Sequence, residues 1–443
     1  MPDIQCSHQD ANESNIRQVC QHLYENTQKQ HYRRWFSEPN MNFKLLCPTC
    51  SEQVGDGNFA IPLLNVCDKC FWHICSYPNT QVGVIFFEPF YQERPSNLSF
   101  THEFVEFAVP INGNILDMQS VCSLREPVWV ALTDEGQLLG LDFSNNSVTK
   151  LAELPLSDLE LLRRPPNKNV ESEEKLYLSP NGQFAAVVNR RGQFGVVVNL
   201  VSNAITMHLE RENYHVEHCD FPIAFFEHKN RTLLMHGTEW NRVDISDLET
   251  SELLTQRASP AYVSGQKPSD HYLEYFHGKL YASPQQDWIA NDGWVWHPYG
   301  SITVWNLSRW LEDNVWESED GSSKKELCER IDWDRSMCWL DNQTLAVWGY
   351  GDFEDDDLIP AARIFDVLTG QEIRHFFGPI GTFVFDEYLF SFTKETGTSV
   401  WDVQTGERLL FDADLRPTVY HHGTKQFLTV LTNQTFLLSR LRQ

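Results

Sequence analysis

The chain has 443 residues, a formal net charge of −26 at pH 7, and 13% aromatic residues. This length exceeds that of a usual single domain, so two domains are expected. The negative charge excludes non-specific binding to nucleic acid or to an anionic membrane, because attraction to phosphates needs clustered Lys and Arg. A basic surface on a partner protein fits this charge better.

The cysteines indicate a reducing compartment. Seven of the 11 cysteines lie in the first 75 residues, and this odd, uneven set suits a metal site better than a disulfide framework. The sequence contains no run of 18 apolar residues, so no membrane span is predicted. The first residues lack the basic and apolar regions of a signal peptide. The sequence therefore predicts a cytoplasmic protein without a membrane segment.

The first predicted element is a helix within residues 14–34. Ile16, Cys20, Leu23 and Thr27 recur there at helical spacing, with polar residues between them. The apolar face of this helix would dock on its own domain. The alternative is that it binds a partner.

Two C-x2-C motifs follow, Cys47 with Cys50 and Cys67 with Cys70, separated by 16 residues. Each pair can form a tight turn around one ion, and four thiolates complete a tetrahedral shell, so the spacing predicts a structural Zn²⁺ site. The alternatives are four reduced cysteines without a metal, or a redox role. The motif is similar to a zinc ribbon, in which zinc replaces the core that so small a unit cannot build.

The rest of the N-terminal region contains fewer signals. His73 and Cys75 could replace a metal ligand, although packed side chains are the commoner role of such residues. Residues 82–87 are predicted to form a buried strand, and residues 88–97, with two prolines, a linker. We therefore expect a small α+β domain over residues 1–100.

A short pattern recurs along the remaining chain: an apolar residue, then Asp or Asn, then an apolar residue. The copies centre on Asp142, Asn199, Asp244, Asn306, Asp366 and Asp402, with a degenerate copy at residues 437–439 that centres on Leu438. Their spacings are 57, 45, 62, 60, 36 and 36 residues, which indicates a repeat architecture. Seven units fit a closed ring of four-stranded blades of roughly 40–45 residues with loop insertions.

Turn residues flank these copies and suggest a family. Residues 179–182, Ser-Pro-Asn-Gly, form a strong hairpin signal. Residues 400–408 share an aromatic-Asp pair and a Thr-Gly turn with residues 364–372. These stretches, with the Trp-Asn pair at Asn306, resemble WD40-type β-propellers. Over residues 101–443 the resemblance implies an all-β, seven-bladed, WD40-like β-propeller that follows the zinc-ribbon-like domain.

The ring also needs a closing strand. The last unit reaches the end of the chain soon after Leu438, before a fourth strand can form. Residues 103–109 alternate like a strand ahead of the first unit. We expect this segment to supply the outer strand of the final blade.

Tryptophan is concentrated in the fourth unit, because nine of the 14 tryptophans lie between Trp288 and Trp348. They would either fill gaps between blades or form an aromatic recognition surface with an acidic rim, since tryptophan is favoured at binding hot spots. The candidates for this partner-binding surface are Trp294, Trp296, Trp310 and Trp316.

An acidic loop in the fifth unit carries five carboxylates within residues 352–357. Asp355 and Asp356 are its candidates for contact with a basic partner. The alternatives are a solvated loop, or a hard cation bound through oxygen ligands, although the spacing does not match an EF-hand.

Common catalytic motifs are absent from the sequence, including a P-loop, a G-x-S-x-G elbow and H-E-x-x-H. His215, Glu217 and His218 are potential metal ligands, but in an extended strand the first two would face away from His218. The sequence therefore favours a non-enzymatic scaffold that binds a protein or peptide. The alternative is a propeller enzyme, a hydrolase or lyase, with its site at the mouth of the central channel.

Overall fold

The computed structural model describes these residues: 16–25, 33–36, 43–55, 60–67, 70–71, 83–86, 91–108, 111–121, 129–165, 167, 170–260, 265, 267–352 and 358–443. The chain divides into two compact units, Met1–Gln92 and Glu93–Gln443. None of the helices in the described ranges is both long and apolar enough to span a membrane.

The first unit contains one five-stranded sheet in the order β4-β1-β3-β2-β5. Its elements are β1 (Ile16–Cys20), α1 (Gln21–Glu25), β2 (Arg33–Phe36), β3 (Phe43–Leu46), α2 (Pro48–Gly55), β4 (Leu63–Cys67) and β5 (Gly83–Phe86). Buried apolar side chains of β1, β3 and β4 form its core, including Val19, Leu45 and Val66. The strand predicted over residues 82–87 is confirmed as β5.

The helix predicted over residues 14–34 is wrong over residues 16–20 and 33–34, which are strands. Ile16–Cys20 pairs antiparallel with β4 and parallel with β3, and among the described residues of this range only Gln21–Glu25 is helical. Two backbone ladders on β1, together with the burial of Val19 and Cys20, outweigh a helical spacing of apolar residues, because local propensity is weak beside tertiary pairing.

The described part of the second unit contains six four-stranded sheets and one three-stranded sheet, all antiparallel. From the innermost strand outward, the first three sheets are β7 (Ile115–Ser120), β8 (Trp129–Thr133), β9 (Gln137–Asp142), β10 (Ser147–Glu153); β11 (Glu174–Leu178), β12 (Phe184–Asn189), β13 (Phe194–Asn199), β14 (Ala204–Glu210); and β15 (Ile223–His228), β16 (Arg231–Glu239), β17 (Arg242–Asp247). The next two are β18 (Phe276–Ala282), β19 (Trp288–Val295), β20 (Tyr299–Asn306), β21 (Lys325–Arg330); and β22 (Met337–Trp339), β23 (Thr344–Tyr350), β24 (Ile359–Asp366), β25 (Gln371–Phe377). The last two are β26 (Thr382–Asp386), β27 (Tyr388–Thr393), β28 (Gly397–Trp401), β29 (Arg408–Asp412); and β30 (Val419–His421), β31 (Gln426–Val430), β32 (Thr435–Arg442), β6 (Ser99–Glu106).

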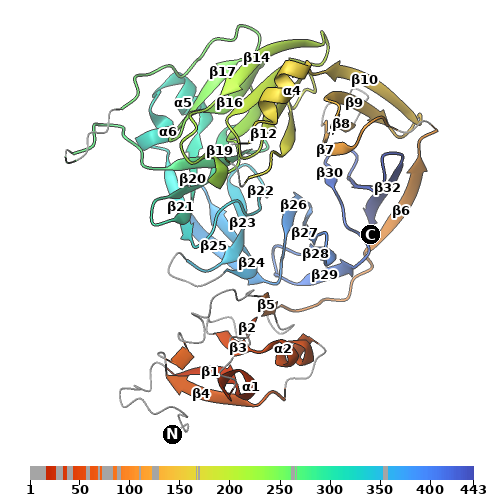
Figure 1. The fold of residues 1–443 in the computed structure, drawn as a ribbon, viewed down its shortest axis with the longest axis vertical. Coiled ribbons are helices and arrows are strands. Elements are labelled where there is room, and N and C mark those ends of the chain that lie inside the picture. Colours follow the sequence, from red (N-terminus) through yellow and green to blue (C-terminus); the bar gives the residue numbers. More distant parts are fainter. Residues whose placement is uncertain are drawn as a thin grey trace. The chain divides into compact units, whose positions relative to one another are not determined.

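These sheets stand around a common centre, as blades do in a β-propeller (Figure 1). The innermost strands of successive sheets are neighbours: β7 and β11, β11 and β15, β15 and β18, β22 and β26, and β30 and β7. Apolar side chains fill the space between adjacent sheets. Val130 and Leu138 of one sheet, for example, share a buried cluster with Val187 and Val196 of the next. The predicted all-β, propeller-like architecture is therefore confirmed.

The two ends of this unit meet in one sheet. Strand β6 pairs with β32 from Ser99 opposite Arg442 to Glu106 opposite Thr435. The segment expected to close the ring, residues 103–109, overlaps the C-terminal part of β6. The side chains reinforce this pairing, since His102 Nδ1 lies 2.8 Å from Ser439 Oγ.

The sequence repeat corresponds to the third strand of each sheet. In most sheets its Asp or Asn ends that strand and accepts hydrogen bonds from the following turn, as Asp366 does from the N–H of Leu368 at 2.8 Å. Asp244 was predicted to have this role in the third sheet, but the prediction is displaced by three residues. There Asp247 accepts from the N–H of Glu249 at 2.9 Å, and Asp244 is buried within β17.

Four short helical segments complete the described part of this unit: α4 (Leu156–Leu162), the 3₁₀ turn η3 (Val216–His218), α5 (Leu307–Glu312) and α6 (Glu317–Asp320). Asn306 caps α5 by accepting a hydrogen bond from the N–H of Arg309 at 3.0 Å. The repeat residue that ends β20 therefore also begins the insertion.

Candidate functional site

A cluster of three cysteines and one histidine lies in the first unit. Cys20 ends β1, His22 lies in α1, and Cys47 and Cys50 flank the start of α2. Their four donor atoms all lie within 4.8 Å of one another, with His22 Nδ1 3.2 Å from Cys50 Sγ. Sulfur and imidazole donors at these separations could bind a metal ion, and zinc prefers this type of donor.

Backbone amides point at the sulfurs of this cluster. The N–H of Cys47 donates to Cys20 Sγ at 3.2 Å, and the N–H of Cys50 donates to Cys47 Sγ at 3.5 Å. All three cysteines are buried, and burial raises the pKa of both the Cys20 and the Cys50 thiol. A bound cation would offset this penalty by stabilising the thiolates.

Of the predicted ligand set, the structure places Cys47 and Cys50 in the cluster. Cys67 lies opposite Ile16 in the β1–β4 ladder, whereas Cys20 lies opposite Leu63 at the other end. Cys70 lies outside the group of four.

Several sequence candidates fall outside the described residues. These are His73, Cys75, Asp355 and Asp356.

Two of the candidate tryptophans pack in the interior of the second unit. Trp294 is buried and stacks on Phe276, with ring centroids 4.0 Å apart and an interplanar angle of 7°. Trp310 is 0% exposed, and its Nε1 donates to the carbonyl of Val315 at 3.0 Å. Both side chains therefore fill gaps in the core and do not lie on a recognition surface.

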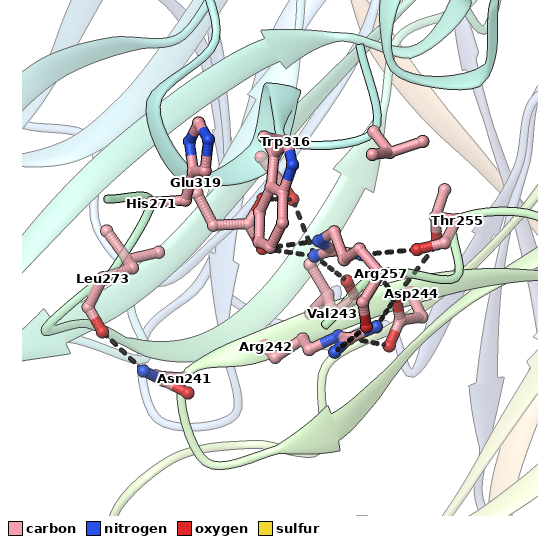
Figure 2. Close-up of polar contacts among 12 residues, drawn as sticks. Asn241, Arg242, Val243, Asp244, Thr255, Arg257, His271, Leu273, Trp316 and Glu319 are labelled. Atoms are coloured by element: carbon pink, nitrogen blue, oxygen red, sulfur yellow. Dashed lines mark hydrogen bonds and ion pairs between the residues drawn. The ribbon is translucent and has the colours of Figure 1, made fainter. Parts of the chain in front are cut away.

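Trp316 covers a buried arginine (Figure 2). The guanidinium carbon of Arg257 lies 5.5 Å from the Trp316 ring centroid, and the same group bonds Asp244, with Nη1 2.5 Å from Oδ1, and Glu319, with Nε 3.1 Å from Oε1. The His271 ring stacks on Trp316, with ring centroids 4.4 Å apart. This tryptophan therefore already has a cation partner within the chain.

Trp296 is different because its side chain is 38% exposed. It lines a groove of about 550 Å³. We call this the aromatic groove, and its lining residues are Glu212, Tyr214, Glu239, Trp240, Asn241, Pro260, Tyr272, Glu274 and Trp296.

Ring contacts hold the aromatic groove in shape. The Tyr214 and Trp240 rings are 5.5 Å apart at 70°, and both contact Phe276, at 5.9 and 4.7 Å. Phe276 in turn lies 5.6 Å from Trp296, at 82°. The groove wall is thus built on the stacked core around β18 and β19.

A polar contact fixes one end of the aromatic groove. Asn241, in the turn between β16 and β17, donates from Nδ2 to the carbonyl of Leu273 at 2.6 Å (Figure 2). This bond links the turn to the segment before β18, which carries Tyr272 and Glu274. The two walls of the groove are therefore held together.

The charge of the aromatic groove is negative. Glu239 accepts a hydrogen bond from Ser259 Oγ and lies 3.6 Å from Arg242 Nη1. Within the described ranges no ion pair involves Glu212 or Glu274, and both residues are exposed. Two carboxylates at this groove thus have no compensating cation from the described chain.

His215, Glu217 and His218 form a second group of potential ligands. The sequence predicts that an extended strand would separate them, but the structure has the 3₁₀ turn η3 here, with His215 at φ 56° before it. Their donor atoms consequently lie within 4.8 Å of one another, and His218 Nε2 is 3.8 Å from Glu217 Oε1.

A larger cavity, of about 640 Å³, borders the innermost strands β18, β22 and β26. Asp334 lines it, with Lys279 and Tyr281. Burial, with the nearby carboxylates of Asp220 and Asp292, raises the pKa of Asp334 to about 7 and outweighs the opposing effect of Lys279.

Sequence reasoning missed several of these residues for identifiable reasons. In the helix predicted for residues 14–34, Cys20 and His22 would lie on different faces, because residues two apart on a helix do not face each other. Their Cys-x-His spacing was the available signal. The groove residues Tyr214, Trp240 and Tyr272 belong to three separate segments, and no local pattern joins them.

No model of a protein family matches the chain. No curated protein matches it either. Among solved structures, it resembles a chain from the "Crystal Structure of Mitotic Checkpoint Complex", with a TM-score of 0.45 and 11% sequence identity over 76% of this chain and 92% of that one.

Proposed function

We propose that this chain is a non-enzymatic protein-interaction scaffold. Its second unit would be a seven-bladed, WD40-like β-propeller that binds a basic segment of a partner protein in the aromatic groove. The observation that supports this most is a concave surface where four aromatic side chains meet two carboxylates, Glu212 and Glu274, that lack a counter-ion in the described chain. Such a scaffold would act in the cytoplasm, as the cysteine pattern predicts.

The chemistry of the aromatic groove selects a cation. Arg or Lys over the face of Trp or Tyr gains about 0.5–2 kcal/mol, more when the site excludes water. Carboxylates at the rim add charge-assisted hydrogen bonds. The net charge of −26 would speed the approach of a basic partner and repel an acidic one.

A binding experiment tests this proposal with the full chain. The probe is a fluorescent Gly/Ser peptide with Arg-Lys-Arg at its centre, and the control probe has Gln at those positions. Fluorescence anisotropy should show binding of the basic peptide only, with an affinity that falls as salt is added.

Substitutions then locate the site. Trp296→Ala and Glu274→Lys should each weaken binding of the basic peptide by about tenfold or more. Phe104→Ala is the matched control, because Phe104 is also an exposed aromatic residue but lies on β6. Equal binding by all three variants, or no binding by the unsubstituted chain, would reject the aromatic groove as the partner site.

The first unit would contribute a structural zinc ion. The turn from Cys47 to Cys50 provides two sulfur ligands, and the N–H of Cys50 already points at Cys47 Sγ. Zinc bound there would add to the stability of a small unit built on short strands. Metal analysis of the purified chain should find about one zinc per chain.

A second candidate function is an enzyme, a hydrolase or lyase, with its site beside the innermost strands. The cavity next to Asp334 favours this alternative, because a carboxyl group whose pKa is about 7 is suited to general acid–base catalysis at neutral pH. Hydrolysis of p-nitrophenyl acetate and p-nitrophenyl phosphate by the unsubstituted chain and by Asp334→Asn would test it. Equal rates for the two proteins would count against a catalytic Asp334.

A further inference from the structure

The donor set that the structure groups in the first unit differs from the two predicted C-x2-C pairs. We infer that Cys20, His22, Cys47 and Cys50 bind the ion, as a Cys₃His set in tetrahedral coordination. The inference rests on the proposed zinc site for the presence of a metal, and it specifies which side chains hold that metal.

The separations of the four donors fit one small ion. Zinc–sulfur bonds of about 2.3 Å and zinc–nitrogen bonds of about 2.0 Å place tetrahedral ligand atoms roughly 3.5–3.8 Å apart. The four atoms lie within 4.8 Å of one another, and His22 Nδ1 is 3.2 Å from Cys50 Sγ. Shifts of a fraction of an ångström to about one ångström would complete the shell.

The backbone positions both halves of this set. Cys47 and Cys50 belong to the turn that begins α2, where the N–H of Ser51 donates to the Cys47 carbonyl at 2.9 Å. Cys20 and His22 belong to the junction where β1 becomes α1. The change from strand to helix directs two side chains, separated by one residue, to the same site.

One hydrogen bond between the halves and one within the Cys47–Cys50 turn support a shared site. The N–H of Cys47 donates to Cys20 Sγ at 3.2 Å, and that of Cys50 donates to Cys47 Sγ at 3.5 Å. Bonds of this type orient metal ligands and stabilise thiolate charge. Cys20 is therefore linked to the Cys47–Cys50 turn by the backbone as well as by proximity.

Strand register separates Cys67 from this site. Val19 pairs with Leu45, so the C-terminal end of β1 lies beside the end of β3 that leads to Cys47. Cys67 pairs with Ile16, four residues back along β1 from Cys20. At about 3.3 Å per residue, this places the backbone of Cys67 about 13 Å along the ladder from Cys20.

Cobalt substitution of the full chain tests the ligand set. Co²⁺ added to metal-free protein should give the visible d–d and thiolate-to-metal bands of tetrahedral S₃N coordination. Cys20→Ser should lower the Co²⁺ and Zn²⁺ affinities by about tenfold or more. Cys67→Ser and Cys70→Ser are the matched controls, and both should leave these affinities unchanged.

His22→Cys provides a readout that a folding defect cannot imitate. It should retain the metal and shift the cobalt spectrum from S₃N to S₄ coordination. Loss of the metal in Cys67→Ser and Cys70→Ser, with normal binding and an unshifted spectrum in Cys20→Ser and His22→Cys, would overturn this ligand set but leave the zinc proposal intact. Failure of the unsubstituted chain to bind either metal would reject both.

Discussion

Arg257 and Trp316 form a cation–π pair inside the second unit, with the guanidinium carbon 5.5 Å from the ring centroid (Figure 2). Arg257 follows β17, and Trp316 lies in the insertion between α5 and α6. The same guanidinium bonds Asp244 of β17 and Glu319 of α6. One buried arginine thus joins the three-stranded sheet to an insertion from the next sheet.

Replacement of this arginine should be costly. Arg257→Met would leave Asp244 and Glu319 buried without their shared cation, and breaking a buried ion pair costs about 3–5 kcal/mol. Urea unfolding should show this loss in the free energy of unfolding. Arg309→Met is the control, since Arg309 is exposed on α5 and its guanidinium bonds only Ser322 Oγ within the described residues. A similar loss in both variants would contradict the special role of Arg257.

The roles of the tryptophans can be separated by stability. Trp310→Ala removes a 0% exposed ring from the cluster of Trp305 and Leu307, and such substitutions cost about 3–5 kcal/mol. Trp296→Ala, at a 38% exposed position, should cost much less. Denaturant unfolding of both variants measures the difference, and equal losses would show that Trp296 is structural too.

Sequence repeats predicted this fold well because they encode local interactions. Asp366 and Asp402 each bond the turn that follows their own strand, so the signal lies within a few residues. Asp244 also matches the sequence pattern, but it bonds Arg242 and Arg257 instead of the following turn, and these contacts depend on the tertiary structure. The pattern alone therefore placed the third copy three residues early.

The candidate sites were predicted only in part for the same reason. Cys47 and Cys50 form a local turn and were found, whereas Cys20 joins them through the pairing of β1 with β3. The aromatic groove needs Tyr214 and Trp240 to meet Trp296, which only the packing of separate sheets provides. A repeat pattern in the sequence does not reveal such contacts between separate segments.

Closure of the ring should depend on the buried face of the β6–β32 pair. Phe436 is 0% exposed and packs 5.4 Å from Phe107, whereas Phe104 on the partner strand is 72% exposed. Phe436→Ala should therefore lose about 3–5 kcal/mol and aggregate more readily on heating, since an opened sheet exposes a strand edge. Phe104→Ala should change stability by about 0.5 kcal/mol or less. Thermal unfolding with light scattering measures both, and matching behaviour would contradict closure through this core.

Asp334 should give the chain a stability that falls as pH rises. Burial, with Asp220 and Asp292, raises its pKa to about 7 in the folded state, against about 4 when unfolded. The folded state therefore binds more protons between these values, and this carboxyl alone lowers stability by up to about 1.4 kcal/mol per pH unit across that window.

Asp334→Asn should remove that penalty. Its stability relative to the unsubstituted chain should increase between pH 5 and pH 7 in urea titrations. Asp332→Asn is the matched control, because the Asp332 side chain is 39% exposed and pairs with Arg335. Parallel pH profiles for Asp334→Asn and the unsubstituted chain would contradict a raised pKa at this position.

His277 should have the opposite dependence on pH. Burial, with the positive charge of Lys324, lowers its pKa to about 3, against the hydrogen bond to Asn291. The unfolded histidine titrates near 6.5, so between these values the unfolded state binds the extra proton. Stability due to His277 is thus complete above about pH 6.5 and falls as pH drops, by up to about 1.4 kcal/mol per pH unit.

His277→Gln should flatten this decline in stability between pH 6.5 and pH 4.5 in urea titrations. His208→Gln, at an exposed position on β14, should leave the decline unchanged. An unchanged slope in His277→Gln would mean that this imidazole accepts its proton while folded.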